Sequence, residues 1–199
     1  MTAGKRFLNV GGGSKTIKVP RHYLGWEHLL LDIDPAGKPD ICADARNMLE
    51  LDPAQFDAVY CSHNLEHYYE HDVPRVLAGF RHVLKPDGFA EIRVPDILGL
   101  MRLVVETRVD FDDKLYDTPM GPVRPKDIVY GFAPEIRKSG HDFYAHKTGF
   151  SHASLIAALK TAGFTDFVAL SPRPVEIAIA AFLAPPSAQT VATLSVANT

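Results

Sequence analysis

The stretch RFLNVGGG, residues 6–13, joins a short apolar run to three consecutive glycines. An apolar run of this length, stopped by turn residues, predicts a buried β-strand. Glycines directly after a strand let a ligand approach the backbone closely, because they carry no side chain. The stretch therefore predicts a first strand that ends at a ligand site.

Further apolar runs follow at residues 28–33, 40–43, 56–61 and 89–94. Residues 72–84, between the last two, repeat apolar side chains at helical spacing, with Asp72 as the expected N-cap and Pro74 in the first turn. A helix over 98–106, a helix capped by Ser151, and strands over 167–170 and 175–183 complete the pattern. Strands that alternate with helices predict an α/β protein with a parallel sheet.

Each early strand ends in glycine or in polar residues: Gly11–Gly13, Asp32, Asp44, Ser62-His63-Asn64 and Asp96. In open α/β sheets, ligands bind beyond the carboxyl ends of the strands. The chemistry of this chain is therefore expected at one edge of the sheet.

The spacing of these residues limits the choice of cofactor. Asp32 follows the glycines by about 20 positions, where a carboxylate can bind both hydroxyls of a ribose. A nicotinamide dinucleotide and S-adenosylmethionine both fit this feature. The dinucleotide fingerprint needs a third glycine that opens a helix for the pyrophosphate. Thr16 stands at that position and Pro20 interrupts any helix, so the sequence favours S-adenosylmethionine, which has no phosphate.

Four ordered segments carry a family resemblance: LNVGGGSKTIKVP, GWEHLLLDIDP, PDICADARNM and the run from FDAVYCSHNLEH to EIRVPD. Residues 7–96 resemble the class I S-adenosylmethionine-dependent methyltransferases, and among them the type 11 methyltransferase group. The helix and turn LIAALKTAGF continue the resemblance near the end of the chain. The resemblance implies a Rossmann-like, doubly wound, mostly parallel seven-stranded sheet whose last strand, VEIAIAAFL, is antiparallel. It also implies an enzyme with S-adenosyl-L-methionine as cofactor and S-adenosyl-L-homocysteine as product.

The resemblance also assigns roles to residues at the strand ends. Glycines 11 and 13 would lie under the methionine part of the cofactor, Asp32 would bind the ribose diol, and Asp44 would meet the adenine amino group. The one departure from the family pattern is Lys15, which stands where a third glycine is common. The implied cofactor-binding residues are Asn9, Gly11, Gly12, Gly13, Asp32, Ile33, Asp44, Ala45, Ser62, His63 and Asn64.

The stretch SHNLEHYYEH, residues 62–71, contains H-x-x-E-H, the inverted zinc-protease pattern. A zinc site of this kind needs a continuous helix and a third ligand. Asp72 starts a new helix soon after the strand, so only about one helical turn fits between them. We therefore expect a strand-end turn without a metal ion. A zinc hydrolase that uses His63, Glu66 and His67 is kept as a remote alternative.

Residues 97–150 break the alternating pattern and are expected to form a substrate-side lid or insert. They are expected either to cover the pocket or to form a homodimer contact. Their last part, GHDFYAHKTGF, pairs aromatic side chains with histidines. His146 and Tyr144 are the preferred acceptor-side catalytic residues, together with His63 from the strand end; His141 is the next candidate.

Length and composition predict one domain over residues 1–184, which the resemblance identifies as a methyltransferase domain, followed by a disordered tail over 185–199, which is rich in small and polar residues. The net charge of −3 and the lack of a basic stripe argue against nucleic-acid partners. No apolar run reaches the roughly 18 residues of a membrane helix, and no signal peptide is recognised. The two cysteines, Cys42 and Cys61, are expected to be buried and reduced.

These features predict a cytoplasmic enzyme that methylates a small molecule. The sequence lacks the N-P-P-[YF] type of motif that is typical of DNA amino-methylation. The alternative from another class is a non-catalytic regulatory protein that binds S-adenosylmethionine or a nucleoside.

Overall fold

The computed structural model describes residues 4–118 and 121–196. Seven strands form one sheet in the order β3-β2-β1-β4-β5-β9-β8. The first five strands run parallel, whereas β9 runs antiparallel to both of its neighbours. The strands are β1 Arg6–Val10, β2 Glu27–Asp32, β3 Ile41–Cys42, β4 Phe56–Ser62, β5 Leu84–Pro95, β8 Asp166–Ala169 and β9 Glu176–Phe182. The predicted fold class is confirmed, and the strand order reverses between β1 and β4.

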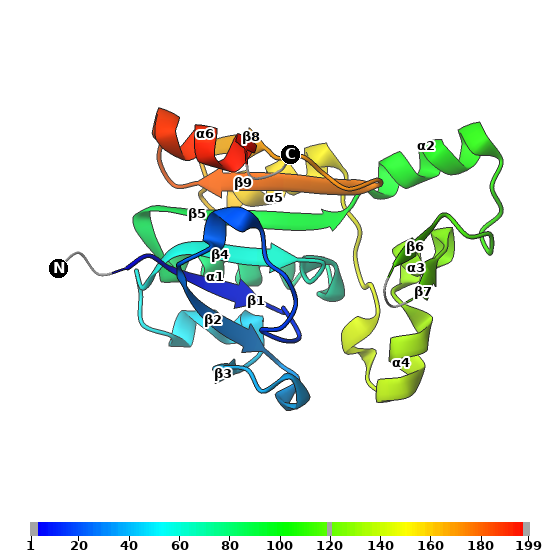
Figure 1. Ribbon diagram of the computed structural model, residues 1–199, viewed down its shortest axis with the longest axis horizontal. Coiled ribbons are helices and arrows are strands. Elements are labelled where there is room, and N and C mark those ends of the chain that lie inside the picture. Colours follow the sequence, from blue (N-terminus) through cyan, green and yellow to red (C-terminus); the bar gives the residue numbers. More distant parts are fainter. Residues whose placement is uncertain (1–3, 119–120, 197–199) are drawn as a thin grey trace.

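Both faces of the sheet are covered (Figure 1). On one face, helices α1 (Val73–Val83) and α5 (His152–Thr161) pack with the short helix η3 (Ala45–Glu50) in the larger core cluster. On the other face lie η1 (Arg21–Tyr23) and α6 (Ala188–Val196). Strand β1 shows why its sequence is mostly apolar. Leu8 and Val10 enter the larger cluster, and Phe7 enters the smaller one.

The helix caps agree only in part with expectation. Ser151 caps α5 by accepting a hydrogen bond from the Ser154 N–H at 3.2 Å. Asp72 lies at the N-cap position of α1 but makes no capping bond. Its carboxylate instead accepts a hydrogen bond from Arg46 at 3.1 Å. The predicted start of α1 is therefore confirmed, with Asp72 at the N-cap and Pro74 in the first turn, but the Asp72 side chain does not cap the helix.

The expected disordered tail over 185–199 is wrong for residues 188–196, which form α6. Leu194 is 1% exposed and lies in the smaller core cluster with Phe7 and Tyr23. Burial of the large Leu194 side chain holds α6 in place, although the small residues of this segment are typical of a linker. Residues 197–199 lie outside the described residues.

Two local expectations also need correction. The sequence Lys85-Pro86-Asp87-Gly88 predicts a turn, but these residues form a bulge inside β5, because Leu84 pairs with Phe56 and Phe89 pairs with Ala58 on β4. Cys61 is buried as expected, but Cys42 is exposed, and both are free thiols. Cys42 is exposed because it lies on β3, the outermost strand of the sheet.

The insert lies beyond the carboxyl ends of the parallel strands (Figure 1). Its backbone returns to the sheet through the bond from Ile97 N–H to Phe150 O at 3.0 Å, and through bonds from Lys147 and Thr148 to Glu66 O. No helix in the described part of the chain is long and apolar enough to cross a membrane. The elements of the insert are α2 Ile97–Thr107, β6 Tyr116–Thr118, β7 Gly121–Val123, α3 Pro125–Tyr130, α4 Ala133–Ser139 and η5 Asp142–Tyr144.

Candidate functional site

The glycine loop after β1 adopts a backbone that only glycine takes easily. Gly11 and Gly13 have φ angles of +69° and +65°. A Cβ on Gly11 would stand 2.1 Å from the side chain of Asn64, which follows β4. The glycine loop and the end of β4 are therefore in close contact, as their position at the reversal of strand order requires.

Asp32, at the end of β2, joins the glycine loop to the next loop. Its Oδ2 accepts the Gly13 N–H at 2.8 Å, and its Oδ1 accepts the Asp34 N–H at 2.9 Å. The residue is 8% exposed. Each carboxylate oxygen has a second lone pair, so the group can hold both loops and still accept bonds from a ligand.

The short helix η2 (Pro35–Gly37) packs directly on the glycine loop. A Cβ on Gly37 would fall 1.9 Å from the carbonyl oxygen of Gly13. On the other side of the loop, a Cβ on Gly12 would lie 2.3 Å from Nδ2 of Asn9, which is 3% exposed. Ile33, directly after Asp32, is 38% exposed.

Asp44 is already bonded within the chain. Its Oδ1 accepts the Arg46 N–H at 2.9 Å, and its Oδ2 accepts the Arg46 guanidinium at 2.6 Å. Burial alone would raise the pKa of Asp44, but these bonds from Arg46 hold it below its ordinary value. Ala45, beside it, is buried. A ligand that meets this position meets an ion pair rather than a free carboxylate.

At the end of β4, His63 has a φ of +52°, a strained backbone for a residue with a side chain. Its Nε2 lies 2.8 Å from Oε1 of Glu176, and its Nδ1 lies 3.4 Å from Oε1 of Glu66. Burial would lower the pKa of His63, but the two glutamates raise it to about 9. The ring is therefore an imidazolium at neutral pH and cannot act there as a base.

The flanking residues differ in their surroundings. Ser62, before His63, is half-buried on β4. Asn64 has a buried Oδ1 that makes no hydrogen bond within residues 4–118 and 121–196. A buried acceptor without a partner costs free energy, so Asn64 is suited to receive a donor from a ligand.

A row of buried charges continues from His63, and sequence reasoning missed it. Glu176 accepts a bond from Arg93 at 3.0 Å, and Arg93 donates to Glu91 at 2.8 Å. Glu91 in turn lies 2.8 Å from His22 Nε2. The signal was present in AEIRVP, where two charged residues two positions apart interrupt a buried strand and therefore share one face.

The insert contributes two of the predicted residues. His146 Nδ1 lies 2.8 Å from the Ile128 carbonyl oxygen, and its Nε2 lies 3.9 Å from Oε1 of Glu66. Burial lowers the pKa of His146, so the neutral ring donates from Nδ1 and keeps the lone pair on Nε2. Burial alone would raise the pKa of Glu66, but its histidine neighbours, led by His63, lower it.

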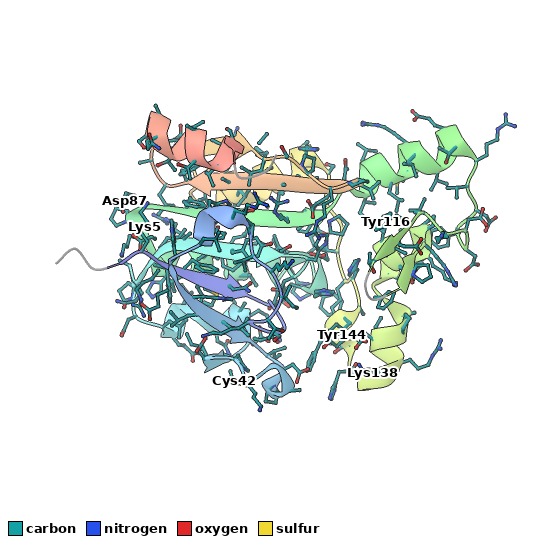
Figure 2. All side chains as sticks on the ribbon, viewed as in Figure 1. Lys5, Cys42, Asp87, Tyr116, Lys138 and Tyr144 are labelled. Carbon is teal, nitrogen blue, oxygen red and sulfur yellow. The ribbon has the colours of Figure 1, made fainter. Side chains whose placement is uncertain are left out.

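Tyr144 lies on the side of the insert that faces the sheet (Figure 2). Burial, followed by the carboxylates of Asp34 and Asp32, raises the pKa of its phenol. The insert thus reaches the end of β2 and the loop after it. His141 is not part of the site, because it is exposed and stacks on Phe143, with ring centroids 4.9 Å apart. The side chain of His71 is 79% exposed.

Comparisons with known proteins agree with this geometry. Residues 8–92 match the family model described as a methyltransferase domain. No curated protein sequence matches the chain. A SAM-dependent methyltransferase from Archaeoglobus fulgidus superposes with a TM-score of 0.52 at 16% identity, over 90% of this chain and 86% of that one.

Two further solved structures are similar to the chain. The glycopeptide N-methyltransferase MtfA, solved with S-adenosyl-L-methionine, has a TM-score of 0.55 at 14% identity, over 92% of this chain and 89% of that one. A 1,6-didemethyltoxoflavin-N1-methyltransferase from Burkholderia thailandensis has a TM-score of 0.50 at 17% identity, over 89% and 69%. At these identities the structures establish a shared fold.

Proposed function

We propose that this chain, whose residues 8–92 match the family model described as a methyltransferase domain, transfers a methyl group from S-adenosyl-L-methionine to a small-molecule acceptor. The acceptor is approached from the side of the insert. The product of the cofactor is S-adenosyl-L-homocysteine.

One observation carries the proposal. The Asp32 carboxylate bonds the backbone N–H groups of Gly13 and Asp34 at 2.8 and 2.9 Å, and it retains lone pairs for the two hydroxyls of a ribose. A carboxylate between a glycine loop and the loop after β2 matches the need of a nucleoside cofactor. The absence of a helix directly after the glycine loop, where only η1 (Arg21–Tyr23) precedes β2, fits a cofactor without a phosphate.

The remaining cofactor contacts follow from position. The glycine loop, with Asn9 beneath it, would lie under the methionine part. The partnerless Oδ1 of Asn64 would accept a hydrogen bond from the cofactor's ammonium group. Ile33 would contact the adenine ring, and the ring's amino group would meet the Asp44 end of η3 beside Ala45. Ser62 and His63 would border the methionine part from the end of β4.

Methyl transfer needs little chemistry from the protein. The acceptor forms a bond to the methyl carbon while the carbon–sulfur bond breaks, and its electron pair stays on sulfur. The sulfonium already activates the methyl group, so the protein mainly positions the acceptor and excludes water. We assign these tasks to the insert, residues 97–150, as a lid, with Tyr144 and His146 on the acceptor side.

The test is calorimetry with S-adenosylmethionine and S-adenosylhomocysteine, followed by a methyl-donor assay over a panel of small hydroxyl, amine and carboxylate acceptors. We expect one equivalent of either cofactor form to bind, and one acceptor class to be turned over. Absence of binding at millimolar concentration would overturn the proposal. Binding without turnover of any acceptor would favour the non-catalytic alternative.

A further inference from the structure

Two adjacent side chains and a third from a distant part of the sequence meet beside the proposed acceptor site. Glu66 and His67 lie in the single turn η4 (Leu65–His67), and His146 comes from the insert. One ligand atom of each lies within 4.8 Å of the others. The rings of His67 and His146 have centroids 5.0 Å apart.

The Glu66 carboxylate has unmet bonding needs. The residue is 1% exposed, and neither carboxylate oxygen has a hydrogen-bond partner among residues 4–118 and 121–196. Its nearest nitrogen neighbours are His63 Nδ1 at 3.4 Å, an ion-pair contact without hydrogen-bond geometry, and His146 Nε2 at 3.9 Å. The His63 imidazolium stabilises the buried charge, and both carboxylate oxygens keep lone pairs that could bind a metal ion.

One of the two histidines, His146, is held in the way that metal ligands are held. His146 donates from Nδ1 to the Ile128 carbonyl oxygen at 2.8 Å, so the lone pair on Nε2 faces the carboxylate. The ring nitrogens of His67 each lie 3.1 Å from a carbonyl oxygen, one of Ala145 and one of His63. Because both nitrogens of His67 face carbonyl oxygens, this ring must turn to offer one nitrogen to a metal ion. For His146, the carbonyl behind the ring fixes the tautomer, as it does in metal-binding histidines.

We propose that Glu66, His67 and His146 form a binding site for one divalent transition-metal ion. Two imidazoles and one carboxylate are the ligands that zinc, manganese and their first-row neighbours take. Two ligand atoms that share a tetrahedral ion at about 2.1 Å each stand about 3.4 Å apart. The pair Glu66 Oε1 and His146 Nε2, at 3.9 Å, reaches that separation by small side-chain rotations.

The ion would join the insert to the sheet. The backbone already makes this connection, because the N–H groups of Lys147 and Thr148 donate to the Glu66 carbonyl oxygen at 2.8 and 3.2 Å. A shared ion adds a side-chain link between η4 and the insert at the same place. With three protein ligands, one position stays open for water or for an oxygen of the acceptor.

This site differs from the H-x-x-E-H alternative in its third member. His63 is paired with Glu176 at 2.8 Å, and His146 takes the place that the pattern gives to His63. The inference does not rest on methyl transfer, since metal binding is measured without cofactor or acceptor.

The experiment uses tag-free protein that has been stripped with a chelator and dialysed. Calorimetric titration with zinc chloride and with manganese chloride measures stoichiometry and affinity, and cobalt(II) absorption reports the ligand set. We expect one equivalent of zinc or manganese to bind, and a higher Tm in the loaded protein. Cofactor binding is measured separately, so a failed cofactor test leaves this result readable.

Three variants decide the assignment. His146→Ala and Glu66→Gln should each weaken binding by roughly 100-fold or more, since even loss of a partner behind a ligand costs about 10- to 100-fold. His71→Ala, in the same stretch and 79% exposed, should leave affinity unchanged. If His146→Ala alters folding, Glu66→Gln with an unchanged apo Tm carries the test. No stoichiometric binding of either metal, or binding that survives both ligand variants, would overturn the proposal.

Discussion

Replacing Asp32 with asparagine separates the two tasks that we assign to this carboxylate. In the native chain, one oxygen accepts the Gly13 N–H and the other accepts the Asp34 N–H, at 2.8 and 2.9 Å. Asparagine keeps one oxygen and puts an NH2 group in place of the other. One of the two backbone N–H groups then faces a donor at a position that is 8% exposed.

The magnitude follows from these two bonds. A hydrogen bond to a charged group contributes about 1.5–3 kcal/mol, and a buried donor without an acceptor costs about 1–3 kcal/mol. One bond of Asp32 would be lost and the other weakened, so we expect the free energy of unfolding to fall by about 3 kcal/mol. Loss of the ribose acceptor should raise the Kd for S-adenosylhomocysteine by about 10- to 100-fold. Urea denaturation, followed by the fluorescence of the single tryptophan, Trp26, and calorimetry measure the two effects.

Asp57→Asn is the matched control. The Asp57 carboxylate accepts the Arg6 N–H and the Lys85 ammonium, each at 2.8 Å, near the amino end of β4. Its loss should also destabilise the fold, but it lies at the opposite edge of the sheet from Asp32. Equal cofactor affinity in the Asp32→Asn and native proteins, or equal weakening in both variants, would refute the cofactor assignment.

Three further changes test other parts of the structure. Burial alone would raise the pKa of Glu176, but its bonds, led by that from His63, lower this pKa to about 2. The lowered pKa stabilises the fold above the ordinary value of 4.5, so this stability should be lost as the pH falls from about 4.5 toward 2. Glu176→Gln should flatten that part of a plot of the urea midpoint against pH. Gly37→Ala would place a Cβ 1.9 Å from the Gly13 carbonyl oxygen, so calorimetry should show weaker cofactor binding. Leu194→Ala, at 1% exposure, should lower the free energy of unfolding by about 2–5 kcal/mol in urea denaturation.

Each of these predictions has a clear contradiction. Gly4→Ala is the control for Gly37→Ala, because a Cβ on Gly4 would have no atom within 4 Å. Equal cofactor affinity in the two glycine variants would exclude contact between η2 and the bound cofactor. A flat native profile between pH 5 and 3 would contradict the Glu176 pairing. A loss below about 1 kcal/mol for Leu194→Ala would mean that α6 does not pack on the sheet.

The strands were predictable because the sheet is covered on both faces. Continuous apolar runs are what such strands require, and β1 begins and ends where its run does. The glycine loop and Asp32 were predictable for a related reason, since their place after the strands is read directly from the sequence. The bond that joins Asp32 to Gly13 was not, because it depends on how two loops approach in space.

Helix α6 was missed for the opposite reason. Its residues are small and polar, and its place in the fold depends on the burial of Leu194 beside Phe7 and Tyr23. Such a contact joins the two ends of the chain. Local propensity gives no sign of it, because tertiary packing rather than helix propensity stabilises most protein helices.

The histidine stretch shows where a spacing argument stops. The sequence predicts that His63 and His67 cannot share a long helix, and the structure has only the turn η4, Leu65–His67, between β4 and α1. That argument tests ligands supplied by one local segment. His146 lies about 80 positions further along and reaches Glu66 only because the insert folds back onto β4. A spacing pattern therefore indicates only whether one segment can form a metal site by itself. The prediction of no metal ion is tested by the titration with zinc and manganese.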